Sequence, residues 1–491
     1  MTAEWIARLD HEYGRGSVSA FSCRLFLWLL GFIYLVAFVS LGVQLLGLIG
    51  HNGILPAEHL LDQASRQLGP ERYWRLPTVY WLHPTDGCLQ AIWMAGAAAS
   101  VLIMLDLAPA LAFIVARLCY VSLTTVCREF LWFQWDSLLL EAGFLAIFLA
   151  PLRIRRGPSA PPSTIVVWLL RWLVFRVMFS SGVVKLASGD PTWRHLTALT
   201  YHYQTQPLPT WTSWHAHHAP LWFHQASCMG IFVLELALPL FVFGPRICRR
   251  IACAGFVVSQ LLILATGNYG FFNLLTIALC LVLLDDAVWP ANRRDTATPV
   301  RAACWPNWLI APLAAGIMAL TLVPMSGLFR GRLGRPSLLT KAYGWVEPFR
   351  IVSSYGLFAV MTTTRLEIIV EGSDDGVAWR AYEFRYKPGD LHRRPPFVAP
   401  HMPRLDWQMW FAALGSYRDN PWFLSFCERL LHGSPDVLRL LAANPFPDHP
   451  PRYVRGVVYE YAFTDAAAKR ADGAWWRREL KGLYCPALTL R

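Results

Sequence analysis

Charged residues are scarce in this chain. Asp, Glu, Lys and Arg make up only 15% of its 491 residues, whereas soluble domains carry roughly 25%. Before about residue 330 long apolar runs dominate, and beyond that point charge, proline and short alternating stretches return. The scarcity of charged residues excludes an ordinary soluble fold for the first two thirds of the chain. It predicts a membrane protein followed by a smaller folded region.

Motifs that mark common chemistries are also missing. The eleven cysteines form no Cys-x-x-Cys pair, which argues against a zinc ribbon or a dense disulfide framework. The net charge of +12 comes from short arginine clusters between apolar runs, so a nucleic-acid partner is not expected. His215-x-His217-His218 could bind a metal, but its irregular spacing favours histidines that bond to backbone and water. We therefore expect neither a metal nor a cofactor.

The apolar runs predict an all-α membrane bundle of about nine transmembrane helices, because a bilayer core needs roughly 20 residues per helix. Candidate spans lie near residues 25–49, 89–106, 109–127, 130–150, 164–187, 228–244, 250–266, 270–289 and 308–328. The second and third are separated only by Pro109. This bundle is expected over residues 1–329, with large loops at 50–88 and 188–227.

Arginine clusters predict the orientation of the bundle, because cytoplasmic loops carry an excess of Lys and Arg. They precede the first span and follow the fourth, sixth and eighth: Arg8, Arg15 and Arg24; Arg153, Arg155 and Arg156; Arg246, Arg249 and Arg250; Arg293, Arg294 and Arg301. With nine spans all four clusters can be cytoplasmic at once. The N-terminus is then cytoplasmic, and both large loops and the segment 330–491 are extracytoplasmic.

Polar side chains inside the predicted spans need a partner or a function, because an ionisable group costs at least about 2.5–3.5 kcal/mol at mid-membrane. The predicted intramembrane polar cluster comprises Asp136, Glu141, Arg176, Glu235, Asn268 and Asn273. Two interpretations stay open. Arg176 pairs with Asp136 or Glu141 and joins two helices, or the cluster lines a polar cavity that opens outward.

Lys185 would lie at the rim of such a cavity. The chain has 39 Arg and five Lys, and Lys185 is the only lysine before residue 341. Burial can lower the pKa of a lysine, which arginine does not offer, so Lys185 is a candidate catalytic base. The alternative is that its ammonium extends to the headgroups.

The segment after residue 330 predicts a small β-rich α+β domain. Residues 366–372 and 379–386 alternate like strands and are joined by a Ser-Asp-Asp-Gly turn, and residues 452–463 read as a further strand. Helical periodicity returns near residues 421–442. No hydrolase, metalloprotease or phosphate-binding motif occurs in this segment, which indicates a binding module.

One aromatic stretch of this segment is a candidate client-binding surface. Trp407, Trp410 and Phe411 are spaced i, i+3 and i+4, so on a helix they share one apolar face. The face either belongs to the core of the domain or contacts partly folded proteins.

Long blocks of the chain resemble the lipase maturation factor family. They are FQWDSLLLEAGFLAIFLAP, FRVMFSSGVVKLASGDPTWRHLTALTYHYQTQPLPT, GNYGFFNLLT, RPPFVAPHMPRLDWQMWFAALGSY and NPFPDHPPRYVRG, in the family's order. The resemblance implies a multi-pass membrane protein, in animals of the endoplasmic reticulum, that assists folding and assembly of secreted dimeric lipases. It also implies a lumenal C-terminal domain that takes part in client binding.

The expected partners are therefore membrane lipids and secreted client proteins. The Ala- and Arg-rich, Lys-poor composition is typical of a high-GC bacterium. There the protein would lie in the inner membrane, and its client would be a secreted protein other than an animal lipase.

A shorter stretch, SGVVKLASGDPTW, is similar to the segment of vitamin K-dependent gamma-carboxylase that carries its catalytic lysine, and Lys185 is the matching position. The similarity covers barely a dozen residues, and a counterpart of that enzyme's large lumenal domain is not evident. It supports a second hypothesis, a membrane enzyme that acts on a lipid, quinone or peptide with Lys185 as its base.

Overall fold

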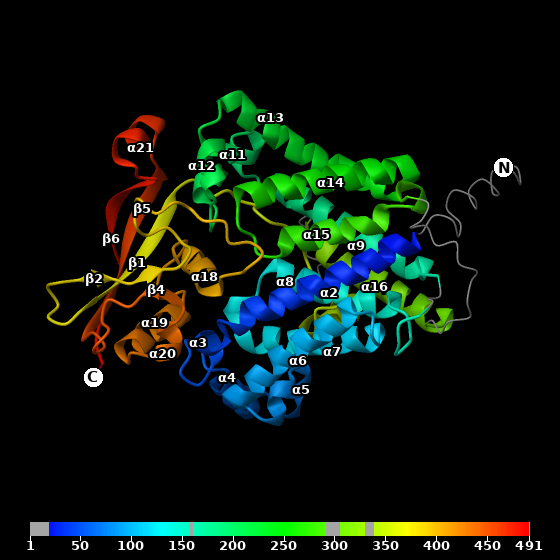
Figure 1. Cartoon of the computed structure of the whole chain (residues 1–491), viewed down its shortest axis with the longest axis horizontal. Helices are drawn as coiled ribbons and strands as arrows, with labels where there is room; N and C mark the ends of the chain where they lie inside the picture. Colours follow the sequence, from blue (N-terminus) through cyan, green and yellow to red (C-terminus); the bar gives the residue numbers. More distant parts are fainter. Residues whose placement is uncertain (1–18, 158–160, 291–304, 329–337, 491) are drawn as a thin grey trace, which may run out of the picture.

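The computed structural model describes residues 19–157, 161–290, 305–328 and 338–490. Most of this part of the chain is helical, and a small antiparallel sheet lies near the C-terminus (Figure 1). Several predicted features fall outside the described residues: Arg8, Arg15, Arg293, Arg294, Arg301 and the domain boundary at 329–330.

Seven helices of the described chain are long and apolar enough to cross a membrane. They are α2 (Ala20–Gly42), α6 (Asp86–Met104), α7 with a short extension (Pro109–Leu131), α9 (Thr164–Ala187), α13 with its continuation (Leu221–Phe243), α14 (Arg246–Thr266) and α16 (Asn307–Leu328). The prediction of a polytopic helical membrane protein is therefore confirmed in this coarser form.

Two predicted spans are shorter in the structure than the sequence indicated. The run 130–150 forms α8 (Gln134–Leu149), and the run 270–289 forms α15 (Phe272–Cys280) followed by two short 3₁₀ segments. Most residues of both helices are buried inside the protein. A helix enclosed by protein need not match the bilayer depth, because neighbouring chain can satisfy its polar groups. Nine crossings thus stay a prediction.

Small residues allow the helices of the bundle to approach closely. A Cβ at Gly96 of α6 would lie 2.1 Å from the Phe38 ring of α2, and one at Gly31 of α2 would lie 2.6 Å from Ile103 of α6. These contacts hold α2 and α6 side by side along their lengths. The chain between the long helices adds α3 (Leu45–Ile49), α4 (Ala57–Leu68), α5 (Arg72–Arg75), α10 (Pro191–Arg194), α11 (Ala198–Thr205) and α12 (Trp211–His217).

The C-terminal region contains a four-stranded antiparallel sheet with the order β2-β1-β5-β6. Its strands are β1 (Arg365–Ser373), β2 (Arg380–Ala381), β5 (Tyr453–Phe463) and β6 (Trp476–Leu488), and β3 (Glu383–Phe384) pairs separately with β4 (Leu441–Ala443). The helices of the region are α17 (Leu338–Val346), α18 (Arg404–Ala412), α19 (Pro421–Leu431), α20 (Pro435–Leu438) and α21 (Ala466–Asp472).

The strand predictions for 366–372 and 452–463 are confirmed by β1 and β5. The predicted strand 379–386 is split, because only its first half pairs with β1 while its second half pairs with β4. The sequence analysis did not identify β6. Seven consecutive residues of β6 are exposed, so it lacks the alternating burial that reveals a strand.

The two ends of the bundle differ in what they carry. At one end Arg250 pairs with Asp285 at 2.6 Å, and the Trp289 indole donates to Ser22 at the start of α2. The other end carries the sheet together with the chain segments that follow α2 and α9, as Figure 1 shows. There Ser434 donates to the Asn52 carbonyl at 2.7 Å.

The hydrophobic core runs without a break from the bundle into the C-terminal region. It joins residues of α2, α7, α8 and α15 to residues of α18, α19 and β1. The division into segments 1–329 and 330–491 therefore describes the order of elements along the chain. That the two segments are separate domains stays a prediction.

Candidate functional site

A cavity of about 580 Å³ lies between α9, α11, α13 and α14. Most of its wall is apolar, with side chains such as Met178, Phe223, Leu234, Leu262 and Ile263. Its polar lining includes Ser181, Lys185, His202, Glu235, Gln260 and Tyr269. Lys185 and Glu235, both predicted from the sequence as site residues, are thus brought to the same wall.

Lys185 and Glu235 form an ion pair at this wall. The Lys185 Nζ donates to Glu235 Oε2 at 2.8 Å, to Oε1 at 3.0 Å and to the Ser181 carbonyl at 3.1 Å. Its side chain is only 5% exposed, against 17% for Glu235. These bonds hold the ammonium inside the protein, so it does not extend to the headgroups as the alternative interpretation proposed.

Local backbone geometry brings Glu235 to this position. Residues Val233–Ala237 form a π-helical turn between α13 and a 3₁₀ segment, and such wide turns are frequent at functional sites. α9 lies close to the turn because Gly182 has no side chain. A Cβ there would lie 2.9 Å from the Glu235 Cβ and 2.7 Å from Leu236.

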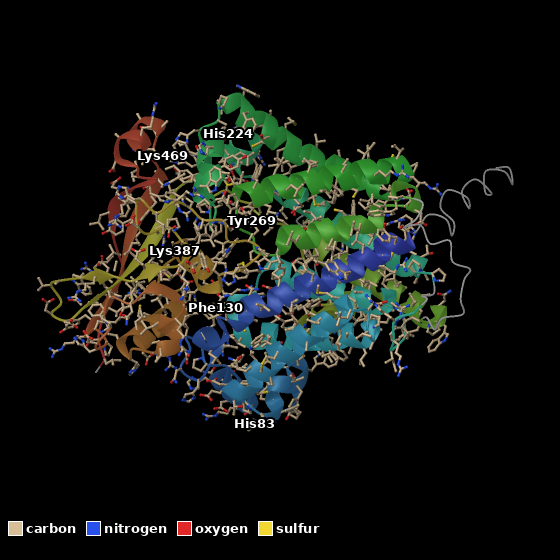
Figure 2. All side chains as sticks on the ribbon, in the orientation of Figure 1. His83, Phe130, His224, Tyr269, Lys387 and Lys469 are labelled. Carbon is tan, nitrogen blue, oxygen red and sulfur yellow. The ribbon has the colours of Figure 1, made fainter. Side chains whose placement is uncertain are left out.

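Neutral polar groups surround the ion pair. The pKa of His202 is lowered to about 4 by burial and by the nearby Lys185 charge, so its ring is uncharged at neutral pH. Its Nε2 lies 3.3 Å from the Tyr269 hydroxyl, which donates to Gln206 at 2.9 Å. Tyr269 lies at the end of α14 that faces the sheet (Figure 2). The cavity therefore reaches the junction with the C-terminal region.

Asn273 lies behind the wall of the cavity and contacts one of its lining residues. Its amide donates to Gln260 Oε1 at 2.9 Å and so orients a side chain that lines the wall. Asn268 instead joins two parts of the protein. It donates to the Pro396 carbonyl at 2.8 Å and accepts from the Val398 and Ala399 amides.

Asp136 lies outside the cavity and pairs with the C-terminal region. Arg404 donates to Asp136 Oδ2 at 2.6 Å and Oδ1 at 2.8 Å, and the Tyr120 hydroxyl adds a bond of 2.6 Å. Both side chains of the ion pair are fully buried. The sequence left Asp136 and Glu141 open as the partner of Arg176, and the structure gives Asp136 a different partner, Arg404.

Glu141 is the partner of Arg176. The Arg176 guanidinium donates to one oxygen of Glu141, while the Tyr355 hydroxyl and the Ser353 amide donate to the other at 2.6 and 3.1 Å. The pair joins α8 to α9, which is the helix-joining interpretation. The two C-terminal donors add a contact that no sequence pattern indicated.

The predicted client-binding face is largely covered. Trp407 is 3% exposed and packs against Phe133 and Trp135, and Trp410 is 8% exposed and donates to the Thr205 carbonyl. Burial against the bundle makes these two tryptophans core residues in this conformation. Phe411 is 39% exposed and is the one of the three that a client could reach.

Arg404, Tyr355 and Arg365 were missed by the sequence analysis. Arg365 is buried, pairs with Glu367 at 2.6 Å and donates to the Gln204 carbonyl at 2.8 Å. All three lie outside the apolar runs, where an arginine or tyrosine is ordinarily a surface residue. No sequence pattern marked these three residues as buried.

The histidine triplet is dispersed. His215 lines the cavity, His217 packs against Phe463, and the His218 ring bonds to the Trp214 carbonyl. In the described ranges no three His, Cys, Asp or Glu side chains converge as metal ligands would.

Comparison with known proteins covers almost the whole chain. Residues 21–291 match the family described as Lipase maturation factor transmembrane domain, and residues 351–486 match Lipase maturation factor C-terminal domain. The chain is 38% identical to Lipase maturation factor 2 of Gallus gallus, over 95% of this chain and 81% of that protein. It is 36% identical to Lipase maturation factor 2 of Homo sapiens, over 95% of this chain and 82% of that protein.

A second group of relatives gives a similar result. Lipase maturation factor 1 of Bos taurus is 36% identical, over 94% of this chain and 87% of that protein. No solved structure matches the chain. The resemblance read from the sequence is confirmed, while the alternative of a membrane enzyme gains no support from these relatives, which are named as maturation factors.

Proposed function

Because the chain belongs to the lipase maturation factor family, we propose that it is a membrane-anchored factor that assists the maturation of secreted lipases. The match to both regions of the named relatives carries this proposal. The site does not favour catalysis, because Lys185 is already bonded to Glu235 and Ser181. The membrane bundle anchors the protein, and the C-terminal region meets the client.

The C-terminal region is proposed to face away from the cytoplasm, into the lumen in animals or the periplasm in a bacterium. Two observations support this orientation. The arginines of the predicted cytoplasmic loops, such as Arg153 and Arg250, lie at one end with their acidic partners. The sheet lies at the other end with loops 50–88 and 188–227 (Figure 1).

Client contact is placed on the exposed apolar side chains at the end of α18 in the C-terminal region. Phe411 and Leu414 are 39% and 52% exposed at the end of α18. Contiguous exposed apolar surface is typical of protein-binding sites. The buried Trp407 and Trp410 support this surface from beneath and do not touch the client themselves.

Capture of newly made lipase tests the proposal. The tagged full-length chain is expressed with a secreted lipase, and lipase that co-purifies from solubilised membranes is measured after a short pulse of labelling. Phe411→Ser with Leu414→Ser should reduce capture, whereas Leu480→Ser on exposed β6 should not. Equal capture of an unrelated secreted protein, or no capture of lipase by the inserted chain, would contradict the proposal.

A further inference from the structure

We propose that the cavity between α9, α13 and α14 binds one molecule of an uncharged, single-chain lipid whose head carries a hydroxyl group. This inference goes beyond the maturation of lipases and does not depend on it. The lipid would enter from the bilayer, lay its chain along the apolar wall and bring its hydroxyl to the Lys185–Glu235 pair.

The position of the cavity indicates that its ligand comes from the membrane. Two of its walls, Leu221–Phe243 and Arg246–Thr266, are candidate spans with only 17% and 28% of their apolar windows buried in the protein. Phe223 and Leu262 line the cavity and are 39% and 63% exposed. An apolar mouth between two lipid-facing helices admits a hydrophobic molecule from the bilayer rather than a solute from water.

The size of the cavity limits the occupant. A volume of about 580 Å³ lies within the range of roughly 300–1,000 Å³ that is typical of sites for one small ligand. A single chain with a small head suits this volume better than a two-chain phospholipid.

The charges in the cavity wall determine which kind of lipid head group fits the site. Lys185 and Glu235 neutralise each other, and His202 beside them is uncharged at neutral pH. An anionic or cationic head would therefore bring an uncompensated charge into a mostly apolar site, which is costly. An uncharged head does not carry this cost.

The hydrogen-bonding capacity of the pair favours a hydroxyl. The three bonds of the Lys185 Nζ match its three protons. Each oxygen of Glu235 accepts one of these bonds, and a carboxylate has about four lone-pair sites. A hydroxyl can donate to a free lone pair of Glu235, which lines the cavity.

Photolabelling of the full-length chain tests this inference. The protein is placed in phosphatidylcholine nanodiscs that contain monooleoylglycerol with a diazirine in its chain, and labelled peptides are identified by mass spectrometry. Labels are expected on α9, α13 and α14 around the cavity. Labels spread over all lipid-facing helices would overturn the proposal.

A matched pair of glycine variants links the label to the cavity. A Cβ at Gly230, which lines the cavity, and one at Gly316 on α16 both meet no atom within 4 Å. Gly230→Phe should remove most of the cavity label and Gly316→Phe should retain it. Equal labelling of two inserted variants would contradict the inference.

Competition in the unmodified chain identifies the head group independently of any variant. An excess of unlabelled monooleoylglycerol should suppress the label, while oleate and oleylamine at neutral pH should not. Suppression by oleate or oleylamine as strong as that by monooleoylglycerol would overturn the assignment of an uncharged head.

Discussion

Arg404 donates to both carboxylate oxygens of Asp136, at 2.6 and 2.8 Å, although 268 residues separate the two in sequence. Asp136 lies in the first turn of α8 inside the bundle, and Arg404 begins α18 of the C-terminal region. Both side chains are excluded from water. The ion pair therefore joins the membrane bundle and the C-terminal region into one structural unit.

Loss of Arg404 should destabilise the whole protein. Arg404→Met leaves the buried Asp136 carboxylate without its charge partner, and breaking a buried pair from one side costs about 3–5 kcal/mol. The melting temperature in detergent should fall clearly, while Arg418→Met on the exposed surface should not change it. The double variant Arg404→Met with Asp136→Asn should recover part of the loss. A single variant as stable as the parent would mean that the pair does not hold the unit together.

Replacement of Gly182 tests the close approach that places Glu235. Alanine ordinarily stabilises a helix over glycine by up to about 1 kcal/mol. At Gly182 the new methyl group would collide with Glu235 and Leu236, and such overpacking costs typically about 1–3 kcal/mol. Gly182→Ala should thus lower the melting temperature, while Gly316→Ala, with open space around it, should not. The same small effect for both variants would remove the steric argument.

Acid should destabilise the fold through buried histidines. Burial lowers the pKa of His202, His217 and His401 to about 4. Nearby positive charge adds to this effect: Lys185 acts on His202, and Arg404 and Arg385 act on His401. His217 is affected in the same way by His218 and His224. The unfolded value is about 6.5, so between these values the unfolded state binds more protons and stability rises with pH. The histidine contribution is complete above about pH 6.5 and is lost as the pH falls towards 4.

Melting temperatures measured from neutral pH downward check this dependence. His202→Gln should weaken the dependence on pH in this window, and His432→Gln on the exposed surface should leave it unchanged. A parent protein whose melting temperature stays constant across the window would contradict the role given to these rings.

The sequence predicted the long helices well because they are surrounded by lipid or apolar protein over full turns. The run 164–187, for example, matches Thr164–Ala187 to the residue. It could not predict Arg404 as the partner of Asp136, or Tyr355 as a further donor to Glu141, because both residues follow the bundle in a segment that reads as soluble. Burial of Trp407 and Trp410 has the same cause, because helical spacing shows that a face is apolar but not what covers it.

The orientation of the bundle can be tested with fusions to a reporter that is active only outside the cytoplasm. A fusion after residue 335 should be active, and one after residue 158 should be silent, because an even number of crossings separates the cytoplasmic N-terminus from residue 158. Reversed activities would invert the orientation. Two active fusions would show that the number of crossings is different from nine.

The proposed role of this membrane protein in making secreted lipases active is tested most directly by the specific activity of a lipase. The full-length chain is expressed with a secreted lipase in cells that lack their own maturation factor, and lipase activity and lipase mass in the medium are measured together. Lipase activity per mass should be higher with the chain than with an empty vector. No increase, although the chain is inserted in the membrane that the nascent lipase crosses, would contradict it.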